Sequence, residues 1–470
     1  MRIHVARNGD SLWQIAQNYG SAVNQIVLLN ELDNPDVLVV GQTLVIPEPG
    51  LEHVIQPGDT LWQIAQMLEV TVQELTAANN ITDPSLIYAG QMLKNPYFTH
   101  IVRAGEYIWL IAQQYGASPE QIIAANDIEP PGLIFPGQTL RIPATAKPVT
   151  EVNAYTTRVD EQGVPDVLRV GRYLTYLSPF MYSITEDGSL TILSEEPVLQ
   201  AAKANNVAPL LVVTNFTQSE FNSDLAAAVL RNTEAQEQLI SELLEVMRAK
   251  GYAGVNFNFE YVYPEDRENY NQFLRRVVAR LHPEGFLVST ALAPKETAGQ
   301  EGLLYEAHDY QAHGEIADFV ALMTYEWGWA GGEPWAIAPV NKVRDILDYA
   351  VTVMPRDKIL MGVPLYGRDW EIPWTEGTIA STVSPKEAVQ LAAVNGVAIQ
   401  YDETYQSPFF RYTDETGQEH EVWFEDARSM QAKYDAVKEY GLRGVSYWAL
   451  GTPFPQNWPV LQDNFNIRKY

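Results

Sequence analysis

Three polar side chains share one face of a short strand predicted near the middle of the chain. Residues 254–260 read Gly-Val-Asn-Phe-Asn-Phe-Glu. Side chains alternate along a strand with a period of two, so Asn256, Asn258 and Glu260 point to one side and the apolar residues between them to the other. A carboxylic acid at the end of such a polar row is suited to donate a proton, and we expect Glu260 to be a catalytic acid.

Strand and helix patterns alternate on both sides of this segment, from residue 151 to the C-terminus. The candidate strands span residues 173–182, 210–214, 254–259, 286–291, 319–324, 359–363 and 444–447. Amphipathic helical segments lie between them. This alternation predicts an α/β fold, a (β/α)8 TIM barrel, in preference to an open doubly wound sheet. Residues 370–430 are too many for one loop and helix, which predicts an inserted α+β subdomain.

The ends of these strands supply further candidates, because the active site of such a barrel forms where its strands end. Tyr325 and Glu326 follow one predicted strand, Tyr366 and Arg368 follow the next, and Trp448 follows the last. Aromatic rings stack on sugar rings, and a carboxylic acid can protonate a glycosidic oxygen. The set therefore indicates a glycan site. For Tyr366 the alternative is ordinary packing at the top of the barrel, and for Arg368 a structural ion pair.

Composition and charge narrow the function classes. The 470 residues are 46% hydrophobic and 19% charged, as in globular proteins of more than one domain. Lys and Arg number 31 against 59 Asp and Glu, a net charge of −28. This balance argues against nucleic acid or an anionic membrane as the main partner. It fits a neutral or mixed-charge polymer such as a polysaccharide.

Several other classes of site are not expected. The chain has no cysteine, which excludes disulfides, thiol chemistry and cysteine-based metal sites. Its seven histidines lack metal-ligand spacing, and His308 and His313 are expected to be surface or capping residues. We predict no metal site and no cofactor. The N-terminus lacks an apolar stretch of signal-peptide length, and no segment has the length of a membrane span.

The first third of the chain contains three copies of one pattern. Residues 9–16 read Gly-Asp-Ser-Leu-Trp-Gln-Ile-Ala, and related segments occur at 58–65 and 105–112. Each copy predicts a strand, two helices and a returning strand. Ser11 and Thr60 suit helix N-caps, each with Gln three residues later. We expect modules at residues 1–48, 51–97 and 99–143, a linker at 144–150 and a large domain at 151–470.

These repeats resemble LysM modules, small βααβ domains that bind glycans. The resemblance rests on the Gly-Asp-Ser/Thr-Leu-x-x-Ile-Ala signature and on the later Gly-Gln pair of each copy. It implies binding to chains that contain N-acetylglucosamine, through the loop with Asp10 and Ser11 or with Asp59 and Thr60. The alternative is that these residues only cap a helix. The third copy departs from the pattern, with Glu-Tyr at 106–107, so both its cap and its glycan contact are open.

The large domain resembles family 18 of the glycoside hydrolases. The family signature Asp-Gly-x-Asp-x-Asp-x-Glu falls on residues 253–260, the Met-x-Tyr motif on 323–325 and the terminal-strand Trp on Trp448. With the repeats and the run Gly-Val-Pro-Leu-Tyr-Gly at 362–367, the chain is similar to the spore cortex-lytic N-acetylglucosaminidases of spore-forming bacteria. The resemblance implies retaining, substrate-assisted hydrolysis. Glu260 would protonate the leaving oxygen, Tyr325 would bind the substrate acetamide and Trp448 would form the pocket floor.

All three aspartates of that signature are replaced. Ala253, Asn256 and Asn258 occupy their positions. In the family, the aspartate at position 258 binds the acetamide N–H and balances the charge of the cyclised intermediate. Asn258 can accept the hydrogen bond but supplies no charge, a deficit of about 1–2 kcal/mol. We therefore expect catalysis slower by about ten-fold.

The resulting hypothesis is a peptidoglycan hydrolase that cleaves after N-acetylglucosamine and is targeted by its LysM modules to spore cortex or cell wall. The expected catalytic residues are Glu260, Asn258 and Tyr325, and the expected substrate-binding residues are Asn256, Glu326, Tyr366, Trp448 and Arg368. We expect a monomer whose partner is peptidoglycan or another polymer containing N-acetylglucosamine, without nucleic acid or membrane. The alternatives are a weak or inactive glycan-binding spore coat or wall protein on the same scaffold, and a chitinase.

Overall fold

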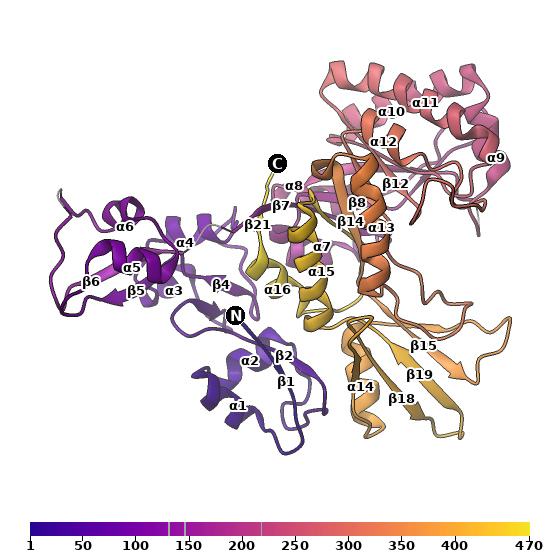
Figure 1. Cartoon of the computed structure of the whole chain (residues 1–470). Helices are drawn as coiled ribbons and strands as arrows, with labels where there is room; N and C mark the ends of the chain where they lie inside the picture. The colour runs from indigo at the N-terminus through magenta and orange to yellow at the C-terminus, as the bar shows by residue number, and fades with distance from the viewer. Residues whose placement is uncertain (130–131, 145–146, 218) are drawn as a thin grey trace.

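The computed structural model describes residues 1–129, 132–144, 147–217 and 219–470. Three small modules form the N-terminal part, followed by a barrel and by an insert within it (Figure 1). Residues 145 and 146 of the predicted linker lie outside the described residues.

The barrel is a closed ring of eight parallel strands, which confirms the predicted (β/α)8 fold. Each strand pairs with two neighbours, and the pairing of β20 with β7 and of β10 with β11 completes the ring. Short strands β9 (Tyr182–Ser183) and β21 (Asn466–Ile467) pair with β10 and β7. The ring runs through β7 (Val149–Thr156), β8 (Tyr176–Pro179), β10 (Ala208–Thr214), β11 (Gly254–Asn258), β12 (Leu287–Leu292), β13 (Phe319–Leu322), β14 (Ile359–Pro364) and β20 (Gly444–Leu450).

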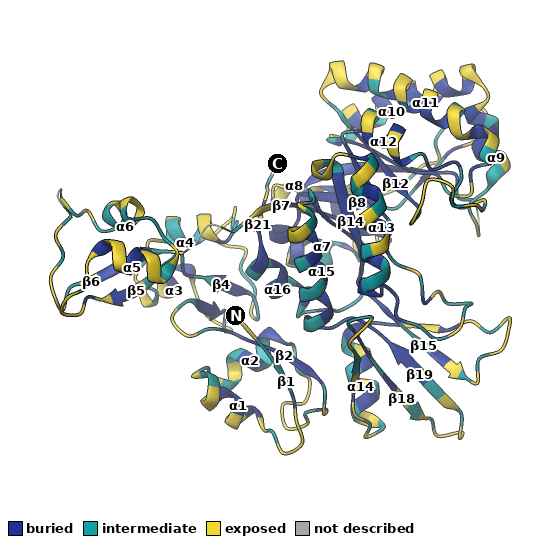
Figure 2. Cartoon of the chain, viewed as in Figure 1, coloured by how far each residue is buried: buried dark blue, intermediate teal, exposed yellow. Residues whose placement is uncertain are grey.

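Helices cover the outside of the ring. They are α7 (Val164–Val170), α8 (Glu196–Ala204), α9 (Ser223–Leu230), α10 (Thr233–Lys250), α11 (Arg267–Leu281), α12 (Tyr310–Ile316), α13 (Val340–Val353), α15 (Ala427–Tyr440) and α16 (Asn457–Asn464). Most of them bury one apolar face against the strands and expose the other, as α10 and α11 show in Figure 2, whereas α16 has no exposed residue. Within the described ranges, no helix is long and apolar enough to cross a membrane.

Two strands differ from their expected positions. The predicted strand at 173–182 is interrupted: a 3₁₀ turn occupies Gly171–Tyr173, and the short strands β8 and β9 follow. Pro179 ends β8, since proline has no N–H for the ladder. Strand β7 was absent from the prediction and begins at Val149, inside the stretch expected to be a linker.

The insert forms between β14 and α15, which confirms the predicted α+β subdomain. Its antiparallel sheet has the order β16-β15-β19-β18-β17 and one helix. The elements are β15 (Gly367–Ile372), β16 (Ser381–Val383), α14 (Pro385–Val394), β17 (Gln400–Asp402), β18 (Ser407–Thr413) and β19 (Glu419–Trp423). Because β15 starts three residues after β14 ends, the insert lies beside the carboxyl ends of the barrel strands.

Each N-terminal module has the predicted strand–helix–helix–strand order. The first contains β1 (Arg2–Val5), α1 (Leu12–Tyr19), α2 (Val23–Leu29) and β2 (Thr43–Ile46); the second β3 (Glu52–Val54), α3 (Leu61–Met67), α4 (Val72–Ala78) and β4 (Met92–Lys94); the third β5 (Tyr97–Ile101), α5 (Ile108–Tyr115), α6 (Pro119–Ala125) and β6 (Thr139–Pro143). Ser11 and Thr60 cap α1 and α3 as predicted, whereas Tyr107 gives α5 no side-chain cap.

The first module is docked on the insert. Val39 is buried in the insert's own apolar core, beside Ile399. The backbone N–H of Ile399 donates to the carbonyl of Val40 over 2.8 Å, and Lys386 pairs with Asp33 over 2.8 Å. These contacts hold the loop between α2 and β2 against the large domain.

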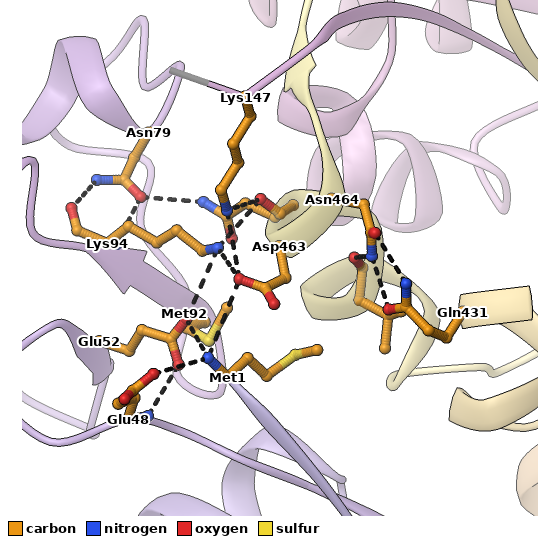
Figure 3. A network of polar contacts seen from close by, with 12 residues as sticks. Met1, Glu48, Glu52, Asn79, Met92, Lys94, Lys147, Gln431, Asp463 and Asn464 are labelled. Atoms are coloured by element: carbon orange, nitrogen blue, oxygen red, sulfur yellow. Dashed lines mark hydrogen bonds and ion pairs between the residues drawn. The ribbon is translucent and has the colours of Figure 1, made fainter. Parts of the chain in front are cut away.

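The second module is fixed to the C-terminal helix of the barrel by a polar network (Figure 3). The Lys94 ammonium of β4 lies 2.7 Å from Oδ1 of Asp463 in α16, and Lys147 reaches the same oxygen over 3.3 Å. The amide of Gln462 donates to Oδ1 of Asn79 over 3.0 Å. The third module has its own apolar core and pairs with the second through Arg141 and Glu74, 2.9 Å apart.

Candidate active site

The polar face of β11 points into the barrel, as the alternation predicted. Asn256 is 1% exposed; its Oδ1 accepts a hydrogen bond from the Tyr155 hydroxyl at 2.8 Å, and its Nδ2 donates to Ser289 Oγ at 3.0 Å. Phe257 and Phe259 point outward into the core formed with the helices. Asn256 therefore links three barrel strands beneath the site, and its own polar atoms are already bonded.

Glu260 follows β11 two residues after the strand ends at Asn258. Its half-buried carboxyl has a pKa raised from its ordinary value to about 7. Desolvation is the main cause; a hydrogen bond from Asn258 lowers the pKa, and the negative charge of Glu326 raises it. A carboxyl group with this pKa is partly protonated at neutral pH, as a general acid requires.

The two polar atoms of the Asn258 side chain differ in their hydrogen bonding. The side chain is 4% exposed and hydrogen-bonds the Glu260 carboxylate, so its amide nitrogen is the donor. Its Oδ1 is buried and accepts no hydrogen bond from the residues that the structure describes. A buried acceptor without a partner is costly, and at the end of a barrel strand it is suited to receive a donor from a ligand.

The predicted aromatic residues belong to one apolar group. Tyr325 and Trp448 pack against the apolar cluster that contains Tyr366. The Trp448 ring lies 4.9 Å from Phe180 and 5.5 Å from Tyr155, centroid to centroid. Tyr325, Tyr366 and Trp448 therefore lie together at the carboxyl ends of the barrel strands.

Glu326 and Arg368 form an ion pair at the edge of the site. Arg368 Nη2 lies 3.0 Å from Glu326 Oε1, and the same oxygen accepts a hydrogen bond from the Tyr366 hydroxyl. The Arg368 guanidinium also lies 4.9 Å from the centre of the Tyr366 ring. Arg368 thus forms the structural ion pair that was the alternative to a glycan-binding role. The pair still belongs to the site, because the negative charge of Glu326 raises the pKa of Glu260.

Three residues near the site were not predicted as site residues from the sequence. Tyr155 lies in the unpredicted strand β7, Asn215 directly follows β10, and His308 precedes α12. The expectation that His308 and His313 are surface or capping residues was wrong, since both are fully buried. Desolvation lowers the pKa of His308 to about 4, which keeps it neutral. No cluster of three or more potential metal-ligating side chains occurs in the described part of the chain.

The predicted glycan-binding residues lie in the modules, away from the barrel site. Asp10 Oδ2 is 2.9 Å from His4 Nε2, and Asp59 Oδ2 is 2.7 Å from His53 Nε2. In the third module Glu106 makes the same contact with a histidine, at 2.9 Å. Glu106 therefore makes the same carboxylate–histidine contact as Asp10 and Asp59, whereas the helix cap, which the sequence left open, is absent at Tyr107.

Known protein families match both the barrel and the N-terminal modules. The family model of glycosyl hydrolases family 18 matches residues 184–452, and that of the LysM domain matches residues 4–47, 53–96 and 100–143. The cortical fragment-lytic enzyme of Bacillus subtilis is 46% identical over 100% of this chain and 99% of its own length. That of Bacillus anthracis is 43% identical, with the same coverage of both chains.

A solved structure covers the whole chain as well. The crystal structure of the spore cortex-lytic enzyme SleL of Bacillus megaterium superposes with a TM-score of 0.78 at 38% identity, covering 100% of this chain and 99% of that chain. The match to these relatives covers the barrel and all three modules. The chain belongs to glycosyl hydrolase family 18 and carries three LysM domains before its catalytic barrel.

Proposed function

We propose that this glycoside hydrolase degrades spore cortex peptidoglycan, cleaving after N-acetylglucosamine with retention of configuration. The proposal is supported by whole-chain similarity to enzymes named for cortex lysis. The observation that carries it is Glu260, whose pKa of about 7 suits an acid that must give up and regain one proton. Its position at the end of a barrel strand, among aromatic side chains, suits a sugar chain.

In the proposed first step Glu260 protonates the glycosidic oxygen, and the carbonyl oxygen of the substrate's 2-acetamido group attacks the anomeric carbon. The leaving sugar departs, and a cyclised intermediate forms. The Tyr325 hydroxyl, whose pKa is raised chiefly by burial, stays protonated and donates to the acetamide. Ionised Glu260 then removes a proton from water, which opens the intermediate with net retention.

Asn258 completes this arrangement. Its amide nitrogen bonds Glu260, and its buried Oδ1 has no partner in the described structure. That oxygen is the proposed acceptor for the acetamide N–H. Asn258 brings no negative charge to the intermediate, and Glu326 is the candidate for that charge, although Arg368 at 3.0 Å neutralises part of it.

The remaining residues would bind the glycan on either side. Trp448 would stack on a sugar ring, Tyr366 and Arg368 would border the glycan, and Asn256 supports the site from below. Asp10, Ser11, Asp59 and Thr60 are the proposed contacts in the LysM domains. The protein would act as a monomer at the spore cortex or cell wall, without nucleic acid, membrane or cofactor.

A second candidate function is a weak or inactive glycan-binding protein of the spore coat or wall. The observation in its favour is the replacement of all three signature aspartates, by Ala253, Asn256 and Asn258. Chitin is the alternative substrate, since it also contains N-acetylglucosamine.

One experiment distinguishes a cortex hydrolase, a chitinase and a non-catalytic binding protein. The purified protein is incubated with cortex fragments, vegetative peptidoglycan and chitin oligosaccharides, and new reducing ends are identified by mass spectrometry after borohydride reduction. We expect reduced N-acetylglucosamine termini from cortex fragments. Muramic acid termini would contradict the proposed bond, faster release from chitin would favour a chitinase, and no release from any glycan would favour the binding protein.

A further inference from the structure

The peptide backbone that carries Glu260 has left the barrel sheet. Strand β11 ends at Asn258, and among the described residues no backbone group pairs with the N–H and carbonyl groups of residues 259–261. Buried backbone groups must be bonded by other means. Here, three successive carbonyls, those of Phe259, Glu260 and Tyr261, accept hydrogen bonds from side chains of three different residues.

Asn215 makes the most complete of these contacts. Its side chain is fully buried directly after β10, the neighbouring strand. Oδ1 accepts the backbone N–H of Glu260 at 3.0 Å, and Nδ2 donates to the carbonyl of Glu260 at 2.8 Å. The same Nδ2 donates to the carbonyl of Asn222 at 2.9 Å. One amide group thus bonds both backbone groups of Glu260 and ties them to the next loop.

His308 holds the preceding peptide from the opposite side. Its Nδ1 accepts the N–H of Ala293 at 2.8 Å, so in the neutral ring Nε2 carries the proton and donates to the carbonyl of Phe259 at 2.9 Å. The Ser223 hydroxyl bonds the carbonyl of Tyr261, whose φ of 53° turns the chain away from the strand. The Glu260 peptide is therefore fixed on both sides by groups from adjacent barrel loops.

We propose that Asn215 is a positioning residue for catalysis, which with His308 fixes the Glu260 peptide so that the carboxyl group meets the glycosidic oxygen. This inference rests on the proposed role of Glu260. In the described structure no strand pairing holds the backbone of Glu260, so the position of its carboxyl group relative to the substrate depends on how this peptide is fixed. Displacing a catalytic group by about 1 Å can slow a reaction about 100-fold.

The first test compares Asn215→Ala with wild type on cortex fragments, with Asn395→Ala as the matched control. Asn395 also bonds a backbone carbonyl through Nδ2, at 2.9 Å, but caps helix α14 in the insert. We expect kcat to fall about 10- to 100-fold in Asn215→Ala with KM changed less than about three-fold, because the glycan-binding surface is untouched. Asn395→Ala should keep the wild-type kcat.

The second test uses the isosteric variant Asn215→Asp and the pH profile. A carboxylate at this position can still accept the Glu260 N–H, but it cannot donate to the Glu260 carbonyl. Its negative charge beside Glu260 disfavours ionisation, so the alkaline limb of kcat should move to higher pH. This shift reports only the charge beside Glu260, whereas kcat on the plateau below the limb measures the positioning and should again fall about 10- to 100-fold. A residue that only stabilised the fold would lower the melting temperature and leave this plateau unchanged.

The results distinguish a failure of the positioning role of Asn215 from a failure of the proposed glycan hydrolysis. If wild type is active and Asn215→Ala keeps kcat within about two-fold, or if Asn215→Asp keeps the plateau kcat within about two-fold, the positioning role is overturned. Should the alanine variant not fold, the aspartate variant decides alone. Failure of wild type to cleave any of the glycans would refute the proposed function instead.

Discussion

Arg368 Nη2, in the first strand of the insert, lies 3.0 Å from Glu326 Oε1, on the loop that follows β13. The negative charge of Glu326 raises the pKa of Glu260, so this ion pair connects the insert with the proposed catalytic acid. The insert therefore contributes a charge to the site as well as a wall beside it.

Replacing Glu326 with Gln should shift the pH profile. Without this negative charge the pKa of Glu260 falls, and Glu260 loses its proton at lower pH. The alkaline limb of kcat/KM should move to lower pH, with activity at pH 8 reduced about two- to five-fold. Arg368→Gln should move the limb the other way, because it leaves Glu326 uncompensated. Exposed Glu371, in the same strand β15, gives the control Glu371→Gln; an equal shift there would refute the assignment.

The variant Asn258→Asp tests how much the absence of a carboxylate at this position lowers kcat. A carboxylate can bind the acetamide N–H and balance the charge of the intermediate, which neutral Asn258 cannot do. We expect kcat to rise about ten-fold at the optimum pH. The optimum itself should move upward, because the hydrogen bond that lowers the pKa of Glu260 is replaced by a negative charge. A slower variant at every pH would mean that the amide donor to Glu260 matters more than the charge.

The raised pKa of Glu260 also predicts how stability depends on pH. Its pKa is about 7 in the folded protein against an ordinary 4.5, so the fold favours the protonated form. This contribution is complete below about pH 4.5 and is lost as the pH rises through 7. Glu260→Gln stays neutral, and its stability relative to wild type should increase by about 1–3 kcal/mol between pH 4.5 and 8. Thermal melts at both pH values measure this, and an unchanged difference in melting temperature would contradict it.

The docking of the first LysM domain can be tested with two glycines at the same turn position. Gly41 has φ +87° and an added Cβ would lie 1.8 Å from the carbonyl oxygen of Ile399 in the insert. Gly137 has φ +86° with nothing within 4 Å of such a Cβ. Both alanine variants carry the turn strain, and only Gly41→Ala should separate the first domain from the insert. Small-angle scattering should show a larger radius of gyration for Gly41→Ala alone; equal values would show that this contact does not hold the domain.

The sequence predicted the elements whose pattern is local. Glu260 was found because it ends a polar row of period two, and the LysM helices because Ser11 and Thr60 are followed by Gln at the capping distance. Strand β7 was missed because its inward side chains include Glu151 and Asn153 and its start follows a proline-containing stretch, which resembles a linker.

Contacts between distant segments could not be predicted in this way. Asn215 bonds a residue 45 positions away, and His308 bonds one 49 positions away. Both are common residue types in loops, and only the closure of the barrel brings those loops together. The same applies to Val39, whose burial depends on the insert of the large domain.

In the proposed mechanism, Glu260 is the acid that breaks the glycosidic bond. The most direct measurement is the rate at which new reducing ends appear from cortex fragments, for wild type and for Glu260→Gln at equal glycan binding. Glutamine keeps the shape of the side chain but cannot donate a carboxyl proton, so the rate should fall at least about 1000-fold while binding to insoluble peptidoglycan is retained. A variant that releases reducing ends at the wild-type rate would show that another group is the acid.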